Sequence, residues 1–154
     1  MTTDLREAVA RAIHEEYLRY RARHPIQSDP SAAAWDELPE ELKESNRRQA
    51  DNIIVKLDRI GCRVHWVTGR EVVRLRMTRR EIETLAEMEH TRWREERCRA
   101  GWRPGRIRNS RRKISPYLTP WGELADEVRE LDRELVRRIP DILARAGLEI
   151  ERAK

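Results

Sequence analysis

Two short stretches of this chain repeat one pattern of side chains: a histidine, an aromatic residue three positions later, and an arginine four positions after that. The six residues are His14, Tyr17, Arg21, His90, Trp93 and Arg97. If both stretches are helical, each trio lies on one helix face, because residues three and four positions apart are neighbours there. An aromatic ring with a cation beside it is suited to stack on and neutralise a flat anionic ligand. We therefore predict that the two trios bind such a ligand.

A second candidate is the arginine-rich stretch at residues 103–113. Its cations are Arg103, Arg106, Arg108, Arg111, Arg112 and Lys113. As a solvated loop this stretch needs no functional explanation, yet arginine binds phosphate through paired N–H groups and a basic arm can contact nucleic acid. No helix-turn-helix, zinc-finger or RNA-binding signature accompanies it. A nucleic-acid or protein interaction through this loop is therefore the alternative hypothesis, ranked second.

Catalytic motifs are missing from the sequence: it has no GxSxG, no HExxH and no phosphate-binding P-loop. Cys62 and His65 fit the alternation of a strand better than a catalytic dyad. Glu89 beside His90 could assist hydrolysis of a bound phosphoester, but acid–base catalysis needs positioned partners that the sequence does not reveal. We expect no enzymatic activity, no cofactor and no metal site.

Charge dominates the composition. Of the 154 residues 40% are charged and 38% hydrophobic, with no phenylalanine, so the core must be thin. The net charge of +5 favours an anionic partner, although interleaved acidic and basic residues are also typical of solvated, ion-paired helices. The two cysteines form no CxxC motif, and no stretch is apolar enough for a signal peptide or a membrane span. We expect a cytoplasmic protein with reduced thiols and no membrane association.

Hydrophobic periodicity and capping signals predict mainly helices. The four helices are expected over residues 4–22, 35–60, from 78 past 93, and 122–146. Asp4 and Thr78, each with a glutamate three positions later, resemble capping boxes. Pro39 suits a first helical position, and Pro140 should kink the last helix or begin a new segment.

Short β-prone runs follow the second and fourth predicted helices. Residues 62–67 and 72–75 flank Thr68, Gly69 and Arg70, which predicts a hairpin. Residues 148–150 are a candidate strand after a glycine cap, and residues 101–120 read as a structured surface loop.

The chain contains an internal repeat. A shift of 86 positions aligns Trp35 with Trp121 and gives about ten identities in thirty residues, while His14 aligns with His90 at a shift about ten residues shorter. The expected fold class is mainly α (α+β): two pseudo-symmetric helix–loop–helix–strand repeats with small β elements, packed as one unit. The expected boundaries are 1–67 for the first repeat, 68–77 for the hairpin or linker, and 78–154 for the second repeat. Tyr17 and Trp93 would then line opposite walls of one cleft.

Both repeats resemble the RyR repeat, which occurs in tandem in ryanodine receptors and in many bacterial and phage proteins. The resemblance covers nearly the whole chain and is most specific in the second repeat. The resemblance rests on His90-x-x-Trp93, Gly101-Trp102-x-x-Gly105, Pro116-x-Leu118-x-Pro120-Trp121-x-Glu123-Leu124, Asp132-Arg133 and Gly147. It implies a mostly helical, non-catalytic recognition module, with an adenine nucleotide stacked between the aromatic residues of the two first helices. Carried onto matching positions, Tyr17 and Trp93 would stack the base, and Arg97 and Arg21 would meet phosphate. The resemblance also implies nucleotide sensing, with an effector protein as a further partner.

Overall fold

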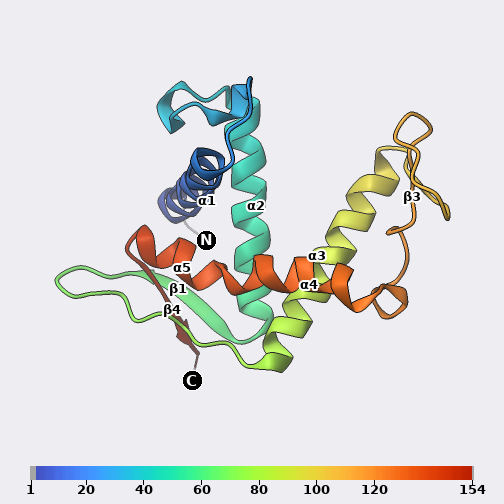
Figure 1. The fold of residues 1–154 in the computed structure, drawn as a ribbon. Helices are drawn as coiled ribbons and strands as arrows, with labels where there is room; N and C mark the ends of the chain where they lie inside the picture. The colour runs from blue at the N-terminus through green and yellow to red at the C-terminus, as the bar shows by residue number, and fades with distance from the viewer. Residues whose placement is uncertain (1–2, 154) are drawn as a thin grey trace. The chain divides into compact units, whose positions relative to one another are not determined.

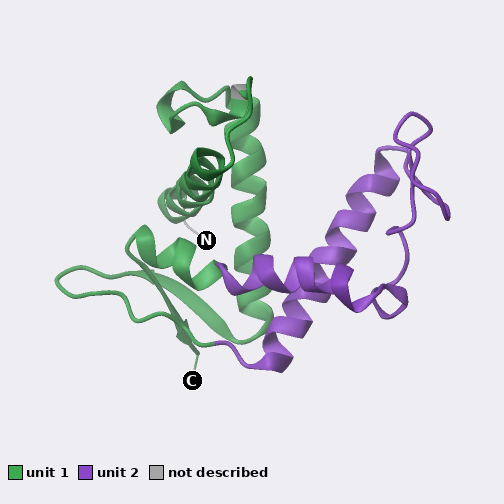
Figure 2. Cartoon of the chain, in the orientation of Figure 1, with its two compact units in different colours: residues 1–76, 139–154 green, residues 77–138 purple. Residues whose placement is uncertain are grey.

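The computed structural model describes residues 3–153, which form two compact units (Figure 2). Unit 1 contains the chain up to Arg76 together with the stretch from Ile139 onward, and unit 2 contains Met77–Arg138. Helices make up most of the described chain and the strands are short, which confirms a mainly α (α+β) fold (Figure 1).

Unit 1 is built on two long helices. α1 (Thr3–Arg23) packs against α2 (Glu40–Arg59), and between them lie the short 3-10 turns η1 (Pro30–Ala32) and η2 (Trp35–Glu37). Small and branched side chains let the two helices approach closely: Val9 and Ala10 on α1 and Ala50 on α2 have no exposed surface. These residues are part of the hydrophobic core of unit 1.

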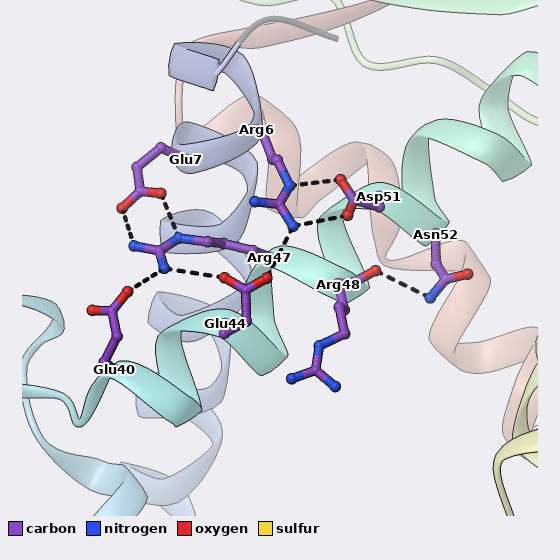
Figure 3. Close-up of polar contacts among 8 residues, drawn as sticks. All are labelled: Arg6, Glu7, Glu40, Glu44, Arg47, Arg48, Asp51 and Asn52. Carbon is purple, nitrogen blue, oxygen red and sulfur yellow. Dashed lines mark hydrogen bonds and ion pairs between the residues drawn. The ribbon is translucent and has the colours of Figure 1, made fainter. Parts of the chain in front are cut away.

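Ion pairs on the rim of this contact join the same two helices. Arg6 on α1 donates from Nε and Nη2 to the carboxylate of Asp51 at 2.8 and 2.9 Å. Arg47 on α2 donates to both oxygens of Glu7 and also to Glu40 and Glu44 (Figure 3). Arg47 therefore links α2 to Glu7 of α1, while its other two carboxylate partners lie on α2 itself.

The strands of unit 1 come from distant parts of the sequence. β1 (Cys62–Trp66) pairs antiparallel with β4 (Leu148–Arg152), with Val64 opposite Ile150. α5 (Ile139–Arg145) contacts β4 and α1. Leu148 and Ile150 are buried, so this pairing supplies apolar surface to the core.

The predicted hairpin of residues 62–67 with 72–75 is therefore wrong. Residues 72–75 form no strand; instead Val73 donates its backbone N–H to the side chain of Glu149 at 2.8 Å. The pairing with β4 wins because Leu148 and Ile150 bury more apolar surface than exposed Val73 and half-buried Leu75 do.

Unit 2 contains α3 (Arg79–Arg99) and α4 (Asp126–Arg137), which pack together. The predicted capping box at the start of α3 is confirmed, since Thr78 accepts from the N–H of Glu81 and Glu81 accepts from that of Thr78. Between the helices lie β2 (Arg103–Pro104), β3 (Ile114–Ser115), which pairs parallel with it, and η3 (Trp121–Glu123). The expected structured loop of residues 101–120 thus contains two short strands and leads into the 3-10 turn η3.

Three predicted helix starts need correction. α1 already includes Asp4 in its first turn, so Asp4 is not its N-cap. α2 begins at Glu40 and α4 at Asp126, because the chain around each preceding tryptophan forms a separate 3-10 turn. Pro39 is accordingly the N-cap residue of α2 rather than its first helical residue. Proline there removes a donor that the first turn would leave unpaired in any case.

The end of the last predicted helix behaves as expected. The helical chain is interrupted at Arg138, before Pro140, and continues as α5. Gly147, with φ of 78°, follows α5 in the left-handed conformation and leads into β4. The predicted strand at residues 148–150 is confirmed and extends to Arg152.

The two compact units follow packing and not the predicted repeat boundaries, because α5 and β4 belong to unit 1. The boundaries 1–67 and 78–154 remain a prediction about sequence ancestry. Across residues 3–153 none of the helices has both the length and the apolar character required to cross a bilayer.

Candidate functional site

The second trio lies on α3 and forms a supported aromatic ring. His90 is buried, and its Nε2 lies 2.7 Å from the carbonyl oxygen of Thr119. Its ring stacks on Trp93, with centroids 5.8 Å apart and an interplanar angle of 25°, and touches Trp121 at 5.9 Å. Half-buried Trp93 is thus held from behind by His90.

Arg97 completes this face. Its guanidinium lies 5.8 Å from the centre of the Trp93 ring and 5.5 Å from that of Trp102. Arg97 is exposed, and among the described residues no carboxylate lies within ion-pair distance of it. Its cation–π contacts orient the side chain while its N–H groups stay available to an anion.

Trp102 reaches Arg97 because α3 ends in a tight turn. Gly101 has φ of 91°, a conformation that favours glycine, and the N–H of Trp102 donates to the carbonyl oxygen of Arg97 at 2.9 Å. Trp102 is not among the site residues predicted from the sequence. Its contact with Arg97 makes it a member of the candidate site.

The first trio on α1 has the same supported ring. Buried His14 places Nε2 2.6 Å from the carbonyl oxygen of Ala33. Its ring stacks on Tyr17 at 6.3 Å and 26°, and contacts Trp35 at 6.0 Å. Each histidine thus bonds to the backbone two residues before a buried tryptophan, Trp35 in the first repeat and Trp121 in the second.

The cation of the first trio, unlike that of the second, is already paired. Arg21 lies 5.4 Å from the Tyr17 ring, and its Nε is 2.9 Å from a carboxylate oxygen of Asp29. The hydroxyls of Tyr17 and Ser31 also donate to Asp29. These hydroxyls, with that of Ser31 the stronger, lower the pKa of Asp29 to about 2, so Asp29 stays ionised and neutralises Arg21. Sequence reasoning missed Asp29, which had no signal beyond its place in a loop.

A pocket of about 210 Å³ adjoins this trio in unit 1. Its lining combines apolar and neutral polar side chains: Ile13, His14, Tyr17, Ser31, Leu38, Leu42, Ser45, Asn46 and Gln49. No aspartate, glutamate, lysine or arginine is among these lining residues. The pocket is therefore suited to a neutral, hydrogen-bonding group such as a nucleobase and not to a phosphate.

The arginine-rich loop lies in unit 2. Arg103, Arg106, Arg108, Arg111 and Arg112 are all exposed. Trp102 connects α3 to this loop, so Arg97 and the loop are neighbours in the fold. The predicted pairing of Tyr17 with Trp93 across one cleft involves both units and remains a prediction.

The chain was compared with known proteins in two ways. A search of curated proteins found no match. The family model described as the RyR domain matches residues 72–152. This match covers more than half of the chain and includes His90, Trp93, Arg97 and Trp102, so the chain belongs to the RyR domain family.

Proposed function

We propose that the chain is a non-catalytic binding module for an adenine-nucleotide-derived ligand, and that the base stacks on Trp93 while phosphate meets Arg97. The observation that carries this proposal is the exposed guanidinium of Arg97, which lies over two tryptophan rings with no carboxylate partner in the described chain. Stacking of a base on an aromatic ring contributes about 1–3 kcal/mol, and charge-assisted bonds to phosphate add to it.

The trio in unit 1 supports a second contact with the same class of ligand. Tyr17 borders the neutral pocket, which has room for a base or a ribose. Because Asp29 neutralises Arg21, we assign base recognition to the Tyr17 side and phosphate recognition to Arg97. The buried histidines act as supports: His14 and His90 fix the rings of Tyr17 and Trp93 from behind.

We further propose that this module senses a nucleotide signal in the cytoplasm and that an effector protein reads its occupied state. The proposal includes no cofactor, no metal and no chemical step.

The test is ligand binding by the purified protein, measured by thermal shift and then by isothermal titration calorimetry. The compounds are ATP, ADP, ADP-ribose, and cyclic and linear dinucleotides. A ligand at 100 times its dissociation constant raises stability by about 2.7 kcal/mol, which is a clear shift. Trp93→Ala should then weaken binding about 5- to 150-fold, which corresponds to the loss of one stacked base.

Two further variants separate stacking from charge. Arg97→Gln should weaken the binding of phosphorylated compounds and leave the binding of adenosine nearly unchanged. Arg99→Gln is the matched control: Arg99 is exposed on the same helix, 3.8 Å from Glu95. Equal losses in the Arg97 and Arg99 variants, or a folded protein that none of these compounds stabilises, would count against the proposal.

A further inference from the structure

The excess positive charge of the chain is confined to one segment. Residues 97–122 contain eight arginine or lysine residues and no aspartate or glutamate. This segment therefore carries a charge of +8, and because the whole chain carries +5, the remainder carries −3. A charge so concentrated indicates an anionic partner more strongly than the overall net charge does.

The arginine loop within this segment, residues 103–113, is an ordered structure. Arg103 donates its N–H to the carbonyl oxygen of Lys113 at 2.8 Å, and Gly105 donates to that of Ser115 at 3.3 Å. Farther along the loop, Asn109 and Ile114 exchange two backbone hydrogen bonds of 3.0 and 2.9 Å. The ends of the loop are thus tied together, and its arginines are presented from a defined backbone.

Gly105 is required for this closure. A Cβ atom at this position would meet Cγ2 of Ile114 at 2.4 Å, which is too close for any packed pair of carbon atoms. A side chain at residue 105 would have to displace the side chain of Ile114, which glycine avoids. The loop can therefore be disturbed at Gly105 without removing any of its charges.

The arginines of the loop differ from those elsewhere in the fold. Arg47 and Arg133 are each surrounded by three carboxylates, from Glu7, Glu40 and Glu44 in one case and from Glu83, Asp126 and Glu130 in the other. In contrast, the five loop arginines are exposed and have no carboxylate within ion-pair distance in the described chain. Ile107, between two of them, is 82% exposed. This surface has no internal partner to satisfy its charge.

We propose that the arginine loop binds the phosphate backbone of nucleic acid. Five guanidinium groups on one closed loop match a ligand with many regularly spaced phosphates, and arginine forms paired hydrogen bonds with phosphate oxygens. The major groove of DNA admits a two-stranded element, and Ile107 on such an element would meet sugar or base edges there. Carboxylates also accept paired bonds from arginine, so the regular spacing of the phosphates along a duplex is what favours nucleic acid over an acidic peptide.

The proposal is tested with a fluorescent 20-base-pair DNA duplex and the RNA duplex of the same sequence, by anisotropy between 50 and 200 mM salt. If all five arginines contact phosphate in the DNA duplex, log K should fall against log salt with a slope of about −4.5. The variant with Arg106, Arg108 and Arg111 all changed to glutamine should reduce the slope to about −1.8. A control with Arg23→Gln, Arg48→Gln and Arg63→Gln removes the same net charge from exposed positions in unit 1 and should keep the slope near its original value.

Gly105→Val keeps every charge and tests whether the closed conformation of the loop is needed for binding. It should weaken duplex binding at least 5-fold. Cooperative unfolding of this variant shows that the protein is still folded. Equal losses in the two triple variants would overturn the proposal, because net charge and not the loop would then explain binding. So would unchanged affinity in Gly105→Val, or preferential binding to poly-glutamate or to vesicles of anionic lipid over either duplex.

Discussion

Arg47 Nε lies 2.8 Å from Glu7 Oε2 in unit 1, and this contact has a close counterpart in unit 2. There Arg133 Nε lies 2.8 Å from Glu83 Oε2. Each arginine also lies over a buried tryptophan. The guanidinium of Arg47 is 5.9 Å from the ring centre of Trp35, and that of Arg133 is 5.8 Å from the ring centre of Trp121. These matched contacts support the predicted repeat, because the alignment of the sequence places the same residues at equivalent positions.

Arg47→Met should destabilise unit 1, since it removes the bonds to Glu7 and leaves that carboxylate without its strongest partner. Because these groups are partly exposed, the expected loss is at the lower end for charged hydrogen bonds, about 1–2 kcal/mol. For a chain of this length the melting temperature should fall by about 2–8 °C. Arg133→Met should have a similar effect in unit 2, and thermal unfolding followed by circular dichroism measures both.

The control for this prediction is Arg48→Met. Arg48 is exposed on the same helix and its guanidinium contacts none of the carboxylates in Figure 3. Its substitution should leave the melting temperature within about 1 °C, as is usual for surface positions. A loss equal to that of Arg47→Met would show that general charge and not the α1–α2 ion pairs stabilises the unit.

Glu149 makes the stability of unit 1 depend on pH. Its carboxylate accepts from Arg70 and from the N–H of Val73, and these bonds, with that of Arg70 the strongest, lower its pKa to about 2. A carboxylate whose folded pKa lies below its unfolded value of about 4.3 stabilises the fold above that value. This stabilisation should be lost as the pH falls from about 4.5 to 2.

The measurement is the melting temperature of the wild type and of Glu149→Gln from pH 7 to pH 2. At pH 7 the variant should melt several degrees lower, and the difference should shrink below about pH 4.5 as the wild-type carboxylate is protonated. Glu151→Gln is the control, because the side chain of Glu151 is 65% exposed. A constant difference between wild type and Glu149→Gln across this range would contradict the assignment.

Local signals predicted much of the fold and the two helix faces that carry the candidate site. The capping box of Thr78, the helix break before Pro140 and the shared helix face of His90 and Trp93 depend on residues close in sequence. The pairing of Asp29 with Arg21 and the contact of Trp102 with Arg97 were not predicted. Both depend on the path of a loop, which hydrophobic periodicity does not encode.

The partner of the first strand was also predicted wrongly. Residues 62–67 and 72–75 are β-prone and only a short turn apart, which made the local hairpin the simplest interpretation. The partner of β1 is instead β4, more than eighty residues away. Strand propensity reports suitability for a half-buried sheet surface and says nothing about the partner, which packing of the whole unit selects.

A single engineered cysteine distinguishes the two pairings. Cys62 lies opposite Arg152 in the β1–β4 register, and the N–H of Ala153 donates to the carbonyl oxygen of Gly61 at 2.7 Å. That bond makes Cys62 and Arg152 a non-hydrogen-bonded pair, the kind in which opposing Cα atoms are closest and a disulfide fits. With Cys98→Ser removing the exposed thiol, Arg152→Cys should therefore form a disulfide with Cys62 under mild oxidation, detected by mass spectrometry. Glu151→Cys, whose side chain projects from the opposite face of β4, should remain reduced. A disulfide formed as readily by Glu151→Cys as by Arg152→Cys, or by neither variant, would contradict the β1–β4 register.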